Sequence, residues 1–162
     1  MALTVGTNTY ATQAEADAYA SARSWTDWAA LTNAAKELRL TDAAIYIDTS
    51  YTFKGAITSE TQAMSWPRTG VVDGEGRTLA ADLYPERLKA AQIELARLAA
   101  TPLVVTDTAG EVKSIQAGSV ALTFRDSQTV SEGAKYRPID RLLTGLYLSR
   151  AGLLRNIRFS KA

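Results

Sequence analysis

The sequence contains no cysteine and no histidine. Without cysteine, the chain can form no disulfide, no zinc–thiolate site and no thiol nucleophile. Without histidine, it lacks the most common general base, the most common transition-metal ligand and the base of a serine triad. An enzyme built from this chain would depend on carboxylates, on lysine or on a bound hard cation. We therefore expect no enzymatic activity, no catalytic residue, no cofactor and no resident metal.

The sequence also lacks any apolar run close to the ~20 residues that a membrane-spanning helix needs. Its first ten residues show neither the charged region nor the apolar region of a signal peptide. We expect a soluble protein that is not exported by that route and has no membrane partner. A length of 162 residues fits one domain, 1–162, and a domain of this size needs no cross-link to fold.

Positive and negative charges nearly balance over the chain, which has a net charge of +1. Its distribution is uneven, however. From Arg141 to the C-terminus there are 5 basic residues and no acidic one, whereas the part before it has 13 basic and 17 acidic residues. A basic segment on a mildly acidic body favours contact with an acidic protein surface or with phosphates. The alternative is a solvated terminus. We treat residues 147–162 as a basic C-terminal arm.

The N-terminal third carries clear helix signals. Thr12 and Glu15 have the T-x-x-E spacing of a capping box, which predicts a helix over residues 13–22. Trp25 and Trp28 follow, three residues apart and therefore on one helical face. Two tryptophans at this spacing are typical of core anchors rather than of a ligand box.

The next helix begins after Thr32 and runs to about residue 50. It carries apolar residues on two nearly opposite sides. A surface helix has one apolar stripe, so two stripes predict burial on both sides, against the same subunit or a neighbouring one. One stripe comprises Leu31, Ala34, Leu38 and Ile45, and the other comprises Leu40, Ala44, Ile47 and Tyr51.

Residues 52–83 lose the helical pattern and are punctuated by glycines and a proline. A connection of this length is usually functional or partly disordered, so we predict a long loop there. Trp66 and Arg68 are candidate contacts to a neighbouring subunit. Gly74 and Gly76 do not form a phosphate loop, because the lysine and the following hydroxyl are missing.

The clearest helix spans about residues 84–100, with Pro85 in its first turn. One face is apolar and the opposite face is charged. Ile93 lies among the charged residues, where it would suit a contact between subunits. A single exposed isoleucine without a role is the ordinary alternative.

The last third predicts little regular structure. Residues 111–116 and 120–125 read as the strands of a hairpin, and Pro138 starts a short helix. The expected fold is therefore mainly α: a small helical bundle with a short β-hairpin and extended termini.

Four segments, in order along the chain, carry a resemblance to a known family. They are TQAEADAYASAR, then TNAAKELRLTDAAIYID leading to YTFKG, then TQAMSWPRTGV, and finally LKAAQIELA followed by VKSIQAGSVALTF. Together they resemble the head–tail adaptor (connector or neck) proteins of tailed bacteriophages, a family often labelled DnaT-like. The resemblance implies a structural protein that forms a ring, most simply a dodecamer. The ring would dock on the portal protein above and on a stopper or tail-completion protein below. Genome DNA would pass through its channel without sequence specificity.

The same resemblance implies a location in the neck of a virion, after assembly in the host cytoplasm. The basic arm would then be the portal-docking segment, since its apolar and basic residues alternate in a way that suits an extended peptide added to a partner. The expected docking residues are Arg150, Leu154, Arg155, Ile157, Arg158 and Phe159.

Two other function classes remain open. The first is a DnaT-like DNA-binding replication module, although the aromatic residues are expected in helix cores rather than along a basic groove. Strong salt dependence of oligonucleotide binding would favour it. The second is a carboxylate enzyme using magnesium. Against it, Asp42 and Asp48 do not share a helix face, and Asp73 and Glu75 lie in the predicted loop.

Overall fold

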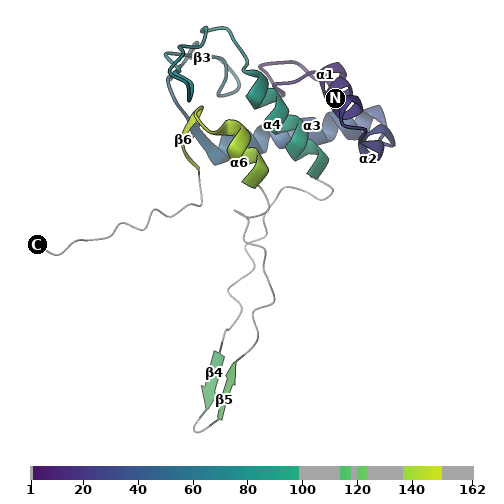
Figure 1. The fold of residues 1–162 in the computed structure, drawn as a ribbon, viewed down its shortest axis with the longest axis vertical. Coiled ribbons are helices and arrows are strands. Elements are labelled where there is room, and N and C mark those ends of the chain that lie inside the picture. Colours follow the sequence, from purple (N-terminus) through teal and green to yellow (C-terminus); the bar gives the residue numbers. More distant parts are fainter. Residues whose placement is uncertain (1, 99–113, 118–119, 124–136, 151–162) are drawn as a thin grey trace, which may run out of the picture.

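The computed structural model describes residues 2–98, 114–117, 120–123 and 137–150. These ranges contain five helices and six short strands (Figure 1). The helices are α1 (Gln13–Ala22), α2 (Thr26–Ala29), α3 (Asn33–Ser50), α4 (Glu86–Leu98) and α6 (Arg137–Leu143). The strands are β1 (Tyr51–Phe53), β2 (Ala56–Ile57), β3 (Arg68–Thr69), β4 (Ser114–Ala117), β5 (Val120–Thr123) and β6 (Tyr147–Arg150).

Both predicted helix caps are present. The hydroxyl of Thr12 accepts a hydrogen bond from the backbone N–H of Glu15, and the Glu15 carboxylate accepts one from the backbone N–H of Thr12. Thr32 accepts from the backbone N–H of Ala35 at the start of α3. Each cap satisfies amides that the first helical turn leaves without a partner, so the sequence located these two helix starts correctly.

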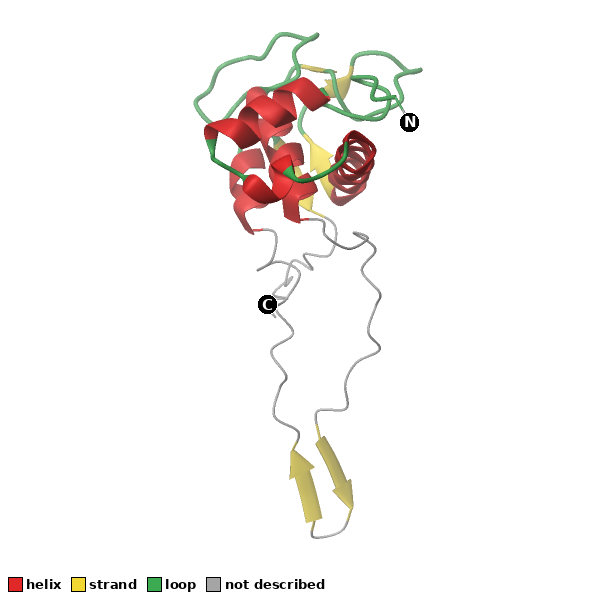
Figure 2. Cartoon of the chain, turned by 90° about the vertical axis from the view of Figure 1, so that its right-hand side faces the viewer, coloured by secondary structure: helices red, strands yellow, loops and turns green. Residues whose placement is uncertain are grey.

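The core lies where α4 packs against α3 and against α6, and the helices gather into one body (Figure 2). Each of the three helices contributes large aliphatic side chains that are fully buried. Removing such side chains from water supplies roughly 25 cal/mol per Å² of apolar surface. The largest aliphatic contributors are Leu40 and Ile47 from α3, Leu88 and Leu95 from α4, and Ile139 and Leu143 from α6.

Only one of the two apolar stripes on α3 is buried. Leu40, Ala44 and Ile47 lie in the core, whereas Leu38 is 63% exposed and Ile45 is 53% exposed. The prediction that α3 is buried on both sides is therefore wrong for this subunit in the part of the chain that the structure describes. Helical periodicity identified both stripes but could not rank them.

The strands form three antiparallel pairs rather than one hairpin. β4 pairs with β5 as predicted, within narrower bounds. In addition, β2 pairs with β3, and β1 pairs with β6. The structure shows helices with short antiparallel strands, and the prediction of a mainly α fold with one hairpin understated the strands. Strands of two to four residues are too short to show the two-residue alternation that reveals a strand.

The segment 52–83, predicted as a long loop, contains the β2–β3 pair. Gly55, directly before β2, permits the close approach of β3, because its φ of +71° is left-handed and an added Cβ would lie 2.3 Å from the carbonyl oxygen of Thr69. The predicted arm 147–162 is also revised at its start. Residues 147–150 form β6 and belong to the folded body, where Tyr51 and Arg150 are register partners. The rest of the arm lies outside the described residues.

Candidate nucleic-acid interface

A groove of about 470 Å³ runs between α1, α4 and α6. Its apolar part is formed by Ile93 and Ala90 of α4 and by Leu142 of α6. Charged side chains and one tyrosine surround this part. The remaining lining residues are Glu15, Ala18, Tyr19, Arg23, Glu86, Arg87 and Lys89.

One of the groove cations is held by acids from two different helices. Lys89 Nζ lies 2.7 Å from Glu15 and 3.2 Å from Glu86. The hydrogen bond to Glu15 is the main reason why the pKa of Lys89 is raised, so this ammonium stays charged at neutral pH. Partial burial opposes ionisation of Glu15, but the hydrogen bonds from Lys89 and Thr12 outweigh it and lower the pKa of that carboxyl.

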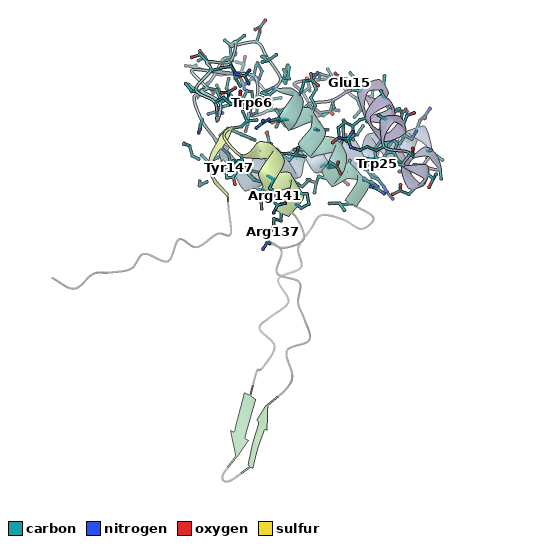
Figure 3. The ribbon with its side chains drawn as sticks, in the orientation of Figure 1. Glu15, Trp25, Trp66, Arg137, Arg141 and Tyr147 are labelled. Carbon is teal, nitrogen blue, oxygen red and sulfur yellow. The ribbon has the colours of Figure 1, made fainter. Side chains whose placement is uncertain are left out.

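Arg87 differs from the other groove cations. Its side chain is exposed, and it forms no ion pair with another described residue. Arg137 and Arg141 are likewise exposed on α6, four residues apart and thus on one helical face, at the edge of the domain (Figure 3). Three arginines around α4 and α6 are therefore available to an external anion.

The C-terminal end of α1 carries stacked arginine and aromatic side chains. The guanidinium of Arg23 lies 3.5 Å from the centre of the Tyr19 ring. Tyr19 meets Trp25 edge to face, with 5.6 Å between ring centres. The guanidinium of Arg97 lies 4.3 Å from the centre of the Trp25 ring. We call these four side chains the arginine–aromatic stack.

Acidic groups hold the stack in place. Arg97 Nε is 2.9 Å from a carboxylate oxygen of Asp27, and the Tyr19 hydroxyl donates to Glu94 at 3.0 Å. Arg23 lies at 3.7 Å from the same Glu94. Cation–π contacts at partly exposed sites contribute modestly, so the ion pairs fix the geometry as much as the stacking does.

A second cavity, of about 370 Å³, opens beside the stack between α1, α2 and the start of α3. Trp25 lines it, so the stack joins the cavity to the groove, which Tyr19 and Arg23 line. We call it the tryptophan cavity. Its other lining residues are Asp17, Ala20, Ser21, Ser24, Thr26, Trp28, Ala29 and Lys36.

One carboxylate organises the wall of the tryptophan cavity. Asp17 Oδ1 accepts from the indole N–H of Trp28 at 2.8 Å and from Lys36 Nζ at 2.9 Å. Burial opposes the ionised form of Asp17, yet the hydrogen bonds from Lys36 and Trp28 lower the pKa of this carboxyl. The wall is therefore charged in both signs and neutral overall.

The structure does not support the predicted subunit contacts at Trp66 and Arg68. Trp66 is fully buried, and its ring packs against Phe53 with 5.7 Å between centres. The Arg68 guanidinium donates to the backbone carbonyls of Lys54 at 2.7 Å and Gly55 at 2.8 Å. Both side chains hold the segment 52–83 together and present little surface to a second subunit.

Ile93 also differs from its prediction. It is 2% exposed, although charged residues surround it in sequence. α6, more than 40 residues further along the chain, packs against α4, and its Leu142 lines the groove together with Ile93. Helical periodicity within 84–100 cannot show a covering element so distant. Trp25 and Trp28 are buried, as predicted for core anchors.

Of the docking residues predicted in the arm, only Arg150 is among the described residues. Arg150 is the last residue of β6. The other members, Leu154, Arg155, Ile157, Arg158 and Phe159, lie outside the described residues.

Among the described residues, no group of three or more acidic side chains could hold a metal ion. In the same part of the chain, no helix has the length and apolar character of a membrane span.

A family model described as "Putative DnaT-like ssDNA binding protein" matches residues 2–159. The chain belongs to this family. No curated protein and no solved structure matches the DnaT-like chain.

Membership overturns the head–tail adaptor prediction. The family description names single-stranded DNA as the ligand of the DnaT-like family, and no match supports a portal, stopper or tail-completion partner. The predicted dodecameric ring and the channel for genome DNA are wrong on the same finding, and so is portal docking. The segments behind the resemblance were helix caps and packing positions, which specify a fold rather than a partner. The location in a virion neck depended on the adaptor assignment and stays a prediction.

The family match favours the alternative hypothesis, a DnaT-like DNA-binding module. The sequence analysis kept it as the alternative, because the aromatic residues were expected mainly in helix cores and the basic residues elsewhere. One signal was present. Tyr19 lies in the helix predicted over residues 13–22 and Arg23 directly follows it, four residues further on, a spacing that can place a guanidinium beside a ring.

Proposed function

We propose that this chain binds single-stranded DNA along the groove between α1, α4 and α6. The observation that carries the proposal is the match of the DnaT-like family model over residues 2–159. Within the fold, the arginine–aromatic stack beside the groove supports it. Base faces stack on aromatic rings and on guanidinium planes only when they are unpaired, so this chemistry favours single strands over duplex.

We expect the DNA phosphates to contact the basic side chains that form no ion pair with an acidic side chain among the described residues. Arg87 lies in the groove, and Arg137 and Arg141 extend the positive charge along α6. Beyond Arg150, the sequence adds 3 basic residues and no acidic one. A net charge of only +1 means that binding depends on this local arrangement rather than on bulk attraction.

Fluorescence anisotropy with a labelled single-stranded oligonucleotide, at several salt concentrations, tests the proposal. The same oligonucleotide annealed to its complement is the duplex control. We expect tighter binding to the single strand and a linear loss of log affinity with log salt, with a slope of about −0.7 for each phosphate contact. Absence of binding at low salt, or equal affinity for duplex, would refute it.

A matched pair of double variants locates the surface. Replacing Arg87 and Arg141 by serine should weaken binding and reduce the salt slope by roughly 1.4, because two phosphate contacts are lost. Replacing Arg39 and Lys54 by serine changes the net charge equally but lies outside the groove lining. Equal losses in the two double variants would show that overall charge, not this groove, binds the DNA.

We further infer that the chain is not an enzyme. The sequence without histidine and cysteine supports this inference, since a side chain that titrates near neutral pH is the usual catalytic group. Incubation with single-stranded DNA or a nucleoside triphosphate and added magnesium tests it. Turnover that rises in proportion to protein concentration and disappears with chelator would contradict it.

A further inference from the structure

The residue Ser24 has a backbone conformation that its side chain disfavours. Its φ is +55°, in the left-handed region. It follows the C-terminus of α1. There the N–H of Trp25 donates to the carbonyl oxygen of Ala20 at 3.0 Å, and the N–H of Ser24 donates to the carbonyl oxygen of Ser21 at 3.0 Å. Glycine is the usual residue at this position of a helix end, because it has no Cβ to clash. Folding stability alone gives no reason for a serine here.

Ser24 is one of the residues that line the tryptophan cavity. A strained residue whose side chain faces a cavity is a recurring feature of binding sites. The cavity volume of about 370 Å³ also falls within the roughly 300–1,000 Å³ of small-ligand pockets. Strain and cavity are independent observations, and both point to a ligand at the same place.

The aromatic wall of the cavity is held before any ligand binds. Trp25 is fixed by the ring edge of Tyr19 and by the guanidinium of Arg97. Trp28 is fixed by its hydrogen bond to Asp17. A wall that needs no rearrangement loses little conformational entropy when a flat ring binds to it.

The polar groups of the cavity select against an anion. Lys36 is almost buried, and its charge is balanced by Asp17 at 2.9 Å. The wall therefore offers no uncompensated positive charge to a phosphate or a carboxylate. The hydroxyl groups of Ser21, Ser24 and Thr26 can each donate or accept. Such a set suits the edge of a nucleobase, where donors and acceptors alternate.

We propose that the tryptophan cavity binds one unstacked nucleobase of a single strand whose backbone lies in the groove. This inference rests on the proposed function, because the strand must first bind. The contact of Tyr19 with Trp25 joins the two places, with Tyr19 lining the groove and Trp25 lining the cavity. A base that leaves the groove beside Tyr19 enters the cavity beside Trp25.

Photocrosslinking tests the position directly in the unmodified protein. A single-stranded oligonucleotide containing 5-iododeoxyuridine is bound, irradiated and digested with trypsin. Residues 1–23 and 24–36 fall in separate tryptic peptides. The peptide 24–36 contains Trp25 and Trp28, and the peptide 1–23 contains Tyr19. A crosslink to 24–36 is expected. A crosslink to 1–23 or to another peptide, without one to 24–36, would overturn the inference and leave the proposed function standing.

Affinity for a strand without bases supplies the second measurement. The wild-type protein should bind an ordinary oligonucleotide at least about tenfold more tightly than a fully abasic one of the same length, since stacking of one base is of this order. The variant Trp25→Leu should reduce that ratio severalfold, because it removes an aromatic ring from the cavity wall.

If Trp25→Leu fails to fold, Ser24→Gly provides a second test. This variant should fold, because glycine adopts the left-handed conformation without strain. It should lower the ratio by a smaller factor, whereas the control Ser59→Gly, outside the cavity lining, should not. A ratio near one in the wild type, or a ratio unchanged in Ser24→Gly, would overturn the base site. Failure of the wild type to bind either oligonucleotide would refute the proposed function as well.

Discussion

The side-chain carbonyl oxygen of Gln92 accepts a hydrogen bond from the backbone N–H of Tyr10 at 2.9 Å. It also accepts from the N–H of Ala11 at 3.0 Å. Its amide nitrogen donates to the Thr9 hydroxyl at 2.7 Å and to the carbonyl of Leu40 at 2.8 Å. One fully buried side chain of α4 therefore ties the N-terminal segment and α3 to the centre of the core.

Replacing Gln92 by leucine should lower the free energy of unfolding by about 2–4 kcal/mol. The substitution preserves the approximate volume but leaves the N–H of Tyr10 buried without a partner, at a cost of about 1–3 kcal/mol. The N–H of Ala11 keeps only its longer bond of 3.3 Å to the Thr9 hydroxyl, and the bonds from the Gln92 amide to Thr9 and Leu40 are lost as well. Urea denaturation measures the change. Gln13→Leu, which removes an exposed hydrogen bond to Asn33, is the control. A loss no larger than in that control would mean that the N-terminal segment is not anchored by Gln92.

Two leucines of α4 allow the stability contribution of a buried side chain to be compared with that of a half-exposed one. Leu95 is fully buried and Leu98 is 44% exposed. Leu95→Ala should cost about 2–5 kcal/mol through the cavity that it leaves, and Leu98→Ala should cost well under half as much. Thermal and urea unfolding of both variants measure the difference. Similar losses would indicate that residues beyond 98 bury Leu98.

Ser24→Gly should stabilise the fold by up to about 1 kcal/mol, because the left-handed conformation costs an ordinary residue about that much more than it costs glycine. The same change at Ser21, inside α1, should destabilise the fold by about 0.5–1 kcal/mol. The two melting temperatures should therefore move in opposite directions. A lower melting temperature for Ser24→Gly would show that the serine side chain stabilises the helix end.

The pair of Glu15 and Lys89 should make stability depend on pH. Because the folded pKa of Glu15 lies below its ordinary value of 4.5, its contribution is present above pH 4.5 and is lost as pH falls through the folded value. The raised pKa of Lys89 gives a contribution that is present below 10.5 and is lost as pH rises through the folded value. The pair therefore stabilises most between about pH 5 and pH 10.

Glu15→Gln tests this window. Its melting temperature should fall below that of the wild type at pH 7, and the difference should narrow between pH 7 and pH 3 as the Glu15 carboxylate is protonated. Glu60→Gln, at an exposed position, is the matched control and should follow the wild type at both values. A constant difference between Glu15→Gln and the wild type from pH 7 to pH 3 would show that the carboxylate charge is not what stabilises the contact.

Local signals in the sequence located the helices. Thr12 with Glu15, and Thr32, marked two helix starts because a capping residue acts on amides within three positions of itself. Contacts between distant segments were not predictable in this way. The burial of Ile93 depends on α6, and the pairing of Tyr51 with Arg150 depends on a strand about 100 residues away.

The candidate interface was less predictable than the fold. The arginine–aromatic stack combines Tyr19 and Arg23 from the region of α1, Trp25 from the start of α2, and Arg97 from α4. Tyr19, Arg23 and Trp25 are close in sequence, whereas Arg97 is about 70 residues away. The left-handed φ of Ser24 also has no sequence signal, since serine is common both in helices and at their ends.

The pairing of β1 with β6 sets a limit on how this domain can be made. During synthesis from the N-terminus, Tyr51 to Phe53 leave the ribosome several seconds before Tyr147 to Arg150, at about 5–20 residues per second. Throughout that interval, the edge of β1 has no partner strand, and α4 lacks the helix that covers Ile93. The nascent chain can assemble α1, α3 and α4 early, but it cannot close its body until the region around residue 150 has emerged.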